Sequence, residues 1–183
     1  MHDAAPDRPT EVDSIDFWSF VAHAHRRLTS EVGATHGLAT ELLLTLNRAA
    51  NIVTYDLEAS VHRPHGLSWS AFRLLFVTWL AGPIEPMNAA RLTGMSRAAV
   101  SNLCKSLERD DLLTRTPAPQ DGRSIRLHLT PTGEERIADV YRAHNEREQA
   151  WADALTEAEQ RILILLLDKL ITDRTQFDVR GRN

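Results

Sequence analysis

The residues with the clearest chemical meaning lie near the middle of the chain, where they have the spacing of a helix-turn-helix. Ala90 is small enough to let two helices cross closely, and Gly94 can adopt the positive φ of the tight turn between them. Val100 and Leu103 recur at the spacing that packs a second helix, expected over residues 96–110, against the first. Such a second helix is the element that enters the major groove of DNA. This spacing therefore predicts a DNA-reading element.

The outer face of this second helix is polar, with basic residues at its edges. Serine and asparagine can hydrogen-bond base edges, an alanine methyl can contact a thymine methyl, and lysine and arginine can reach phosphates. Any amphipathic surface helix has a polar outer face, so the neighbouring segments must decide its meaning. The residues predicted to contact DNA from this helix are Ser96, Arg97, Ala98, Ser101, Asn102 and Lys105.

The segment that follows is predicted to be a β-hairpin wing. Residues 112–116 and 125–129 alternate as a two-stranded ribbon should, around the turn dipeptide Asp121-Gly122. The turn places Arg123 near the hairpin tip, and the negative potential of a narrow minor groove attracts arginine. The alternative is a hairpin with an ordinary surface arginine, which a preceding helix-turn-helix disfavours. The predicted wing contacts are Arg123, Asp121, which could fix the guanidinium of Arg123 or Arg115, and Arg115 and Arg126, which would hold the DNA backbone.

These segments resemble the multiple-antibiotic-resistance regulator (MarR) family of bacterial winged-helix repressors. The residues that carry the resemblance are Leu107–Arg115, Asp121–Ser124 and Leu127–Gly133. The wing signature of the family, Asp and Arg followed by Leu-Thr-x-x-Gly, is matched at Asp121, Arg123, Leu129, Thr130 and Gly133. The resemblance covers roughly residues 40–177. Two departures are Asp111, where the family usually has a glycine and where aspartate tolerates a left-handed conformation, and an added helix before Thr40.

The resemblance implies a function as well as a fold. It implies a symmetric homodimer that places two recognition helices in successive major grooves of a pseudo-palindromic operator. It further implies that a small effector binds near the junction of the dimerisation helices and the winged helix-turn-helix. The effector would bind one arrangement of the helices more tightly than the other and so weaken DNA binding. A repressor that an effector releases is the expected role. The added helix is expected to enlarge the dimer interface.

The expected fold is mainly α with a small β-hairpin wing, a winged helix-turn-helix flanked by long N- and C-terminal dimerisation helices. Ser14, Ser68, Ser96 and Thr130 are expected to cap helices. Pro64 and Gly66 predict a loop over 62–66. Helices are expected over 15–31, 40–61, 68–80, 86–92, 96–110, from Thr130 onward and from Thr156 to about Phe177. The predicted organisation is a disordered tail over 1–13, N-terminal dimerisation helices over 14–61, a DNA-binding domain over 67–130, C-terminal dimerisation helices over 131–177 and a tail over 178–183.

The run from Ile162 to Leu167 is apolar on every side of a helix. A helix that is hydrophobic all round is buried all round, and little else in the C-terminal segment could cover it. We therefore expect a second copy of the chain to cover this helix. The alternative is ordinary packing within one chain.

A candidate effector site lies in the helix expected over 68–80 and in the loop before it. An aromatic wall with one cation suits a planar anionic molecule. The alternative is that the aromatic residues form core and that Arg73 pairs with an acid. The residues predicted to bind the effector are His62, His65, Trp69, Phe72, Arg73 and Phe76.

Composition and charge agree with a DNA-binding protein of one domain with helical extensions. The 183 residues are 43% hydrophobic and carry a net charge of −4, but residues 91–126 hold seven Arg and Lys against four Asp and Glu. The basic charge therefore gathers on the predicted reading module. No apolar run is long enough to span a membrane, and Met1–Asp7 lacks a secretion signal, so a cytoplasmic protein is expected.

Other functional classes find little support in the sequence. The single cysteine, Cys104, excludes an intramolecular disulfide and is expected to be a small hydrophobe rather than a redox sensor. The eight histidines lack metal-ligand spacing, so neither a metal nor a cofactor is expected. No catalytic motif is present, so we do not expect an enzyme. The remaining alternative is a winged helix used for protein contacts, without a DNA site of its own.

Overall fold

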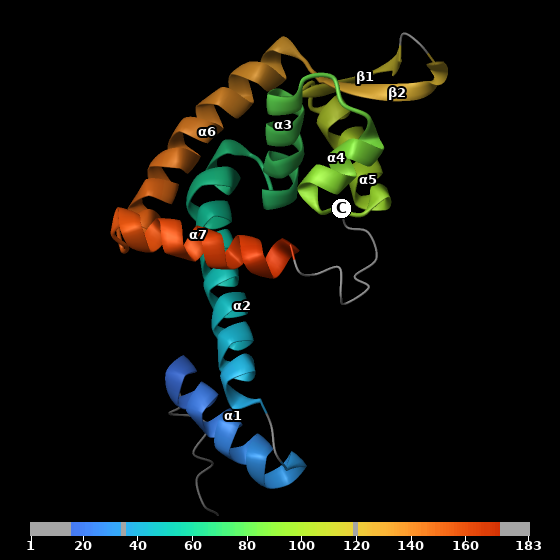
Figure 1. The fold of residues 1–183 in the computed structure, drawn as a ribbon. Helices are drawn as coiled ribbons and strands as arrows, with labels where there is room; N and C mark the ends of the chain where they lie inside the picture. The colour runs from blue at the N-terminus through green and yellow to red at the C-terminus, as the bar shows by residue number, and fades with distance from the viewer. Residues whose placement is uncertain (1–15, 34–35, 119–120, 173–183) are drawn as a thin grey trace, which may run out of the picture. The chain divides into compact units, whose positions relative to one another are not determined.

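The computed structural model describes residues 16–33, 36–118 and 121–172, which Figure 1 draws as a coloured ribbon. The chain divides into two compact units, Met1–Ile52 and Val53–Asn183. Most described residues are helical, and the strands form one two-stranded antiparallel sheet, so the predicted fold class is confirmed. None of the described helices is long and apolar enough to cross a membrane.

The first unit holds α1 (Phe17–Val32) and most of α2 (Gly37–Leu57). Asp16 caps α1, because its carboxylate accepts a hydrogen bond of 2.7 Å from the backbone N–H of Ser19. The predicted cap, Ser14, lies outside the described residues, and the helix begins two residues later than expected. The guanidinium of Arg48 on α2 lies 5.6 Å from the ring centre of Phe17 on α1, within cation–π range.

The predicted loop over 62–66 is wrong, because the chain stays helical through most of it. A π-helical turn, η2 (Glu58–His62), follows α2 directly, and a 3₁₀ turn, η3 (Arg63–His65), follows η2. Pro64 is tolerated because it lies in the first turn of η3, where its missing N–H is not needed. Only at Gly66, with a φ of 75°, does the helical path end.

The reading module is built from α3 (Trp69–Ala81), α4 (Pro86–Thr93), α5 (Arg97–Arg109), β1 (Leu113–Ala118) and β2 (Asp121–Leu129). In Figure 1, α3 stands between α6 (Pro131–Ala152) and the pair α4 and α5, with the hairpin extending beside them. The predicted caps Ser68, Ser96 and Thr130 are confirmed, since each side chain accepts a hydrogen bond from the N–H three residues on. The apolar core residues that are 0% exposed are Leu74, Leu75, Ala89, Val100, Leu127, Ile137 and Val140.

The hairpin is tied to the helices as well as to itself. Its strands pair with Leu113 opposite Leu129 and Arg115 opposite Leu127, up to an irregularity between Pro117 and Ala118. Ile84, in the connection between α3 and α4, exchanges two backbone hydrogen bonds of 2.8 and 3.1 Å with Leu127. The base of the wing is therefore fixed to the connection between α3 and α4 through buried backbone pairing.

The end of α2 is joined to α6 by a cluster of polar side chains. The carboxylate of Asp56 accepts two hydrogen bonds of 2.6 Å from the guanidinium of Arg147 and one of 2.8 Å from the indole N–H of Trp151. The bonds from Arg147 are the largest reason that the pKa of Asp56 lies well below its ordinary value. This bidentate pair fixes the end of α2, which belongs to the second unit, to α6.

The last described helix, α7 (Glu157–Thr172), begins at the predicted capping box. The backbone N–H of Thr156 donates to Glu159 Oε2 at 2.8 Å, and the N–H of Glu159 donates back to the hydroxyl of Thr156. No residue of α7 is buried, although most of the large side chains of this helix are apolar. Coverage of α7 by a second subunit stays a prediction.

Candidate nucleic-acid interface

The turn between α4 and α5 has the geometry that the sequence predicts. Gly94 has a φ of 65°, and the N–H of Met95 donates to the carbonyl of Ala90 at 3.1 Å. The buried face of α5 consists of Val100, Cys104 and Leu107, whereas Leu103 is only partly buried. Cys104 is thus part of the core, as expected of a small hydrophobe, and burial raises the pKa of its thiol.

The outer face of α5 presents the residues that the sequence selected for DNA contact. All six are exposed, and the helix brings them together on the side opposite the buried seam. Arg97 extends toward α4, where its guanidinium lies 3.5 Å from the sulfur of Met87. These exposed residues are Ser96, Arg97, Ala98, Ser101, Asn102 and Lys105.

Arg115 lies on β1, and its side chain forms hydrogen bonds to Glu108 on α5. Its Nε donates to Glu108 Oε1 at 2.8 Å, and its Nη2 contacts the other carboxylate oxygen. The hydrogen bond that Arg115 donates to Glu108 raises the pKa of Arg115. Because this pair joins α5 to the wing, Arg115 is placed to hold the angle between them. The side chains of Asp121 and Arg123 lie outside the description, and Arg126 is half-buried.

The connection after α5 explains the physical role of the Leu-Thr-x-x-Gly segment. Asp111 has a φ of 54°, the left-handed conformation expected at this position. The hydroxyl of Thr130 donates to the carbonyl of Asp111 at 2.6 Å and accepts from the N–H of Gly133 at 2.9 Å. A Cβ on Gly133 would lie only 1.9 Å from the carbonyl oxygen of Leu112. Glycine is required here because the start of α6 rests directly on that backbone.

Two of the predicted effector residues, His62 and Phe72, are buried, and the other four are half-buried: His65, Trp69, Arg73 and Phe76. The ring of His62 lies 4.3 Å from that of Phe72 and 5.4 Å from that of Trp69, and Phe72 continues the stack to Phe76 at 5.6 Å. The ring Nδ1 of the half-buried His65 lies 2.6 Å from the carbonyl oxygen of Val61.

Arg73 occupies the edge of the same stack. Its guanidinium lies 5.7 Å from the ring centre of Trp69 and 3.6 Å from where a Cβ on Gly94 would be. Within the described residues no carboxylate pairs with Arg73, and partial burial lowers its pKa. This half-buried cation therefore lies between α3 and the turn of the helix-turn-helix.

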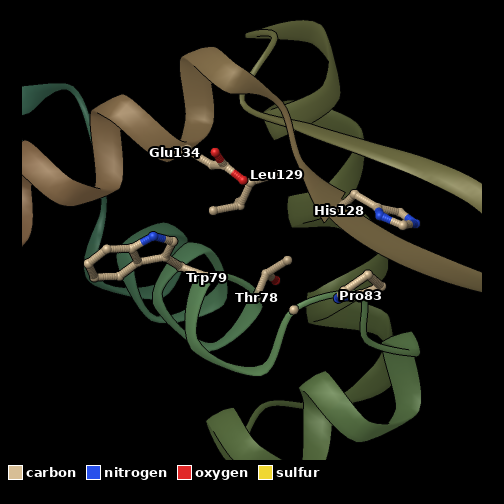
Figure 2. Close-up of a pocket in the computed structure, with 7 residues that line it drawn as sticks. Thr78, Trp79, Pro83, His128, Leu129 and Glu134 are labelled. Carbon is tan, nitrogen blue, oxygen red and sulfur yellow. The ribbon is translucent and has the colours of Figure 1, made fainter.

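A small cavity of about 170 Å³ lies at the base of the wing. Figure 2 shows Glu134 and Leu129 on one side of it, Trp79 and Thr78 on the other, and the ring of His128 turned outward. None of the six predicted effector residues lines this cavity. The lining residues are Thr78, Trp79, Gly82, Pro83, His128, Leu129 and Glu134.

Sequence reasoning missed a histidine pair beneath the aromatic stack. Nε2 of His62 lies 3.1 Å from Nδ1 of His144 on α6, and both side chains are buried. The apolar spacing of Ile137, Val140 and Tyr141 does place His144 on the inner side of its helix. No local signal could connect it with a residue 82 positions earlier in the chain.

Comparisons with known proteins agree with this geometry. Residues 65–124 match the MarR family model. The HTH-type transcriptional regulator YwaE of Bacillus subtilis is 30% identical over 72% of this chain and 77% of its own length. The HTH-type transcriptional regulator MgrA of Staphylococcus aureus is 26% identical over 74% of this chain and 91% of its own. The solved structure of the transcriptional repressor CouR bound to a 23-mer DNA duplex is 26% identical, covers 75% of this chain and 97% of that one, and has a TM-score of 0.67.

Proposed function

We propose that this chain, which belongs to the MarR family of transcriptional regulators, is a homodimeric repressor that reads a pseudo-palindromic operator and is released by a small effector. The observation that carries the proposal is the division of α5 into two faces. Val100, Cys104 and Leu107 are buried against the reading module, while the short polar residues opposite them, with flanking cations, are exposed. A helix held in this way can place its outer face in a major groove.

Separate observations support the dimer, the binding of DNA and the effector. A second copy of the chain would cover the exposed apolar residues of α7. The similarity to CouR, whose solved structure contains DNA, supports DNA binding and repression. Arg73, stacked on Trp69 without a carboxylate partner among the described residues, favours an aromatic anion as the effector. In the wing, Arg123 is proposed to enter the minor groove.

The test is selection of fragmented genomic DNA of the source organism on the purified full chain, followed by sequencing of the bound fragments. We expect a few fragments that share an inverted repeat. On such an operator, Asn102→Ala should weaken binding by about 5- to 150-fold, because an asparagine that reads an adenine contributes about 1–3 kcal/mol. Asn145→Ala, which changes an exposed asparagine on α6, should leave the affinity unchanged.

The alternative, a winged helix used only for protein contacts, makes the opposite prediction. It predicts no bound fragments, or a sequence-blind sample that washes off at moderate salt. An operator whose affinity is insensitive to Asn102→Ala would instead show that DNA is read by a surface other than the outer face of α5.

A further inference from the structure

Two histidines that DNA reading does not use meet inside the second unit. His62, at the end of η2, is 0% exposed, and His144, on α6, is 4% exposed. Nε2 of His62 lies 3.1 Å from Nδ1 of His144, and Nε2 of His144 lies 3.0 Å from a carboxylate oxygen of Glu148. The remaining ring nitrogen, His62 Nδ1, is buried and has no hydrogen-bond partner among the described residues.

This arrangement assigns the protons of the neutral pair. Glu148 is an acceptor when ionised, so His144 donates to it through Nε2 and keeps a lone pair on Nδ1. His62 must then donate through Nε2 to that lone pair, which leaves its own Nδ1 unprotonated. One hydrogen bond thus joins the two rings. The lone pair on His62 Nδ1 is buried and has no partner among the described residues.

A further proton has no favourable place in this cluster. On His62 Nδ1 it would create a buried cation whose N–H donor has no hydrogen-bond partner among the described residues. Transfer of the charge to His144 would reverse the shared hydrogen bond and still leave an unpaired N–H on His62. Protonation therefore favours conformations in which the pair is opened to water.

The charged groups around the pair do not remove this cost. Glu148 favours a proton on His144 but is 47% exposed, whereas His65 opposes one on His62. Burial is the main cause that lowers the pKa of His62, to about 4, and it also lowers that of His144. Among the other charged groups of the neighbouring elements, Glu58 pairs with Arg63, Asp56 pairs with Arg147, Arg136 donates to the carbonyl of His65, and Arg73 lies over Trp69.

We propose that the His62–His144 pair is a proton-operated latch, closed when both rings are neutral and opened by protonation in mildly acidic solution. The latch joins η2 to α6, and α6 begins at the wing, where Gly133 rests on Leu112. Opening it loosens the helix that supports the reading module. If the chain is the DNA-binding regulator proposed above, its affinity for the operator falls with acidity.

The sign of the effect on stability follows from the lowered pKa values. The folded chain binds fewer protons than the unfolded chain, whose histidines titrate near 6.5. The stabilising contribution of the pair is therefore complete above that pH and declines as the pH falls toward about 4. The unfolding equilibrium constant should rise by up to about tenfold per pH unit for each proton taken up on unfolding.

The test compares urea unfolding of the full chain at about pH 7.5 and about pH 5. His62→Gln keeps a side-chain N–H donor for His144 but cannot titrate, so it should lose most of the stability change that the wild type shows. His36→Gln, which replaces an exposed histidine, should retain that change. An equal change in the wild type and His62→Gln overturns the latch. Should His62→Gln fail to fold, the pKa of His62 in the ¹⁵N-labelled wild type decides, since an ordinary value near 6.5 overturns the latch.

A second measurement separates the latch from the proposed function. Operator affinity is measured at about pH 7.5 and about pH 5.5 for the wild type, His62→Gln and His36→Gln. The latch predicts that acidity weakens binding by the wild type and His36→Gln much more than binding by His62→Gln. The same pH dependence in all three overturns the regulatory part of the proposal. Absence of operator binding at both pH values overturns the proposed function, while the unfolding result still decides the latch.

Discussion

Helices α5 and α7 both carry several apolar residues, but only α5 buries some of them. In α5, Val100, Cys104 and Leu107 are buried against the helices and strands of the reading module. In α7, no residue is buried, and Ile164 and Leu165 are 64% and 68% exposed. The reading module therefore completes its own core within one chain, whereas α7 presents an apolar surface that the second unit does not cover. One region buries its apolar residues within the chain, and the other leaves them exposed.

The largest expected effect comes from disrupting the packing of α6 against the reading module. Gly133→Ala would place a Cβ at 1.9 Å from the carbonyl oxygen of Leu112, and neither backbone can move freely. We expect the free energy of unfolding to fall by about 3 kcal/mol, at the upper end for an overpacked site. Urea unfolding of the full chain measures this loss.

A matched glycine provides the control for this prediction. Gly66→Ala faces only the flexible guanidinium of Arg136 at 3.8 Å, so its cost is that of a left-handed alanine, about 1 kcal/mol. Gly133 lies in α6 without a positive φ, so equal losses in the two variants would show that the contact with Leu112 costs no more than a left-handed alanine does.

The next prediction tests whether α7 is covered by a second copy. Leu165→Gln should raise the dissociation constant of the dimer at least tenfold, because burial of a leucine side chain contributes about 1.5–3 kcal/mol. Leu92→Gln changes a leucine that is 52% exposed on α4 and should leave the dimer unchanged. Sedimentation equilibrium over a range of concentrations measures both constants. Equal dissociation constants for the two variants would place the subunit interface away from α7.

The same contrast explains which features the sequence could predict. Caps at Ser68, Ser96 and Thr130, and the left-handed Asp111, depend on residues a few positions away, and each was predicted correctly. The start of the first helix was misplaced because Asp16 caps it with an equally ordinary local signal. Proline and glycine predicted a loop over 62–66, although a π-turn lets the helical path continue.

Contacts between distant segments could not be predicted from the same evidence. In the candidate site, the outer face of α5 followed from helical spacing alone, but the bond from Arg115 to Glu108 did not. Arg115 was predicted to hold the DNA backbone, with Asp121 as the carboxylate that could fix its guanidinium, whereas the structure pairs it with Glu108. The pairing of Ile84 with Leu127 and the His62–His144 pair likewise depend on how the helices pack. Packing of this kind is set by the whole core rather than by any window of the sequence.

The smallest expected effect sharpens the account of how the reading module closes its core. At Asp111, glycine would relieve a left-handed strain of about 1 kcal/mol. Asp111→Gly would also give up the hydrogen bond of 3.3 Å from the Thr132 hydroxyl to the carboxylate, and the unfolded chain would gain freedom. These effects oppose each other, so the free energy of unfolding should change by less than about 0.5 kcal/mol. Asp111→Ala loses the bond and keeps the strain, so it should destabilise the module by about 1 kcal/mol in the same urea titration. If Asp111→Ala is as stable as the wild type, the carboxylate adds nothing, and the turn is held entirely by Thr130 and the backbone at Leu112.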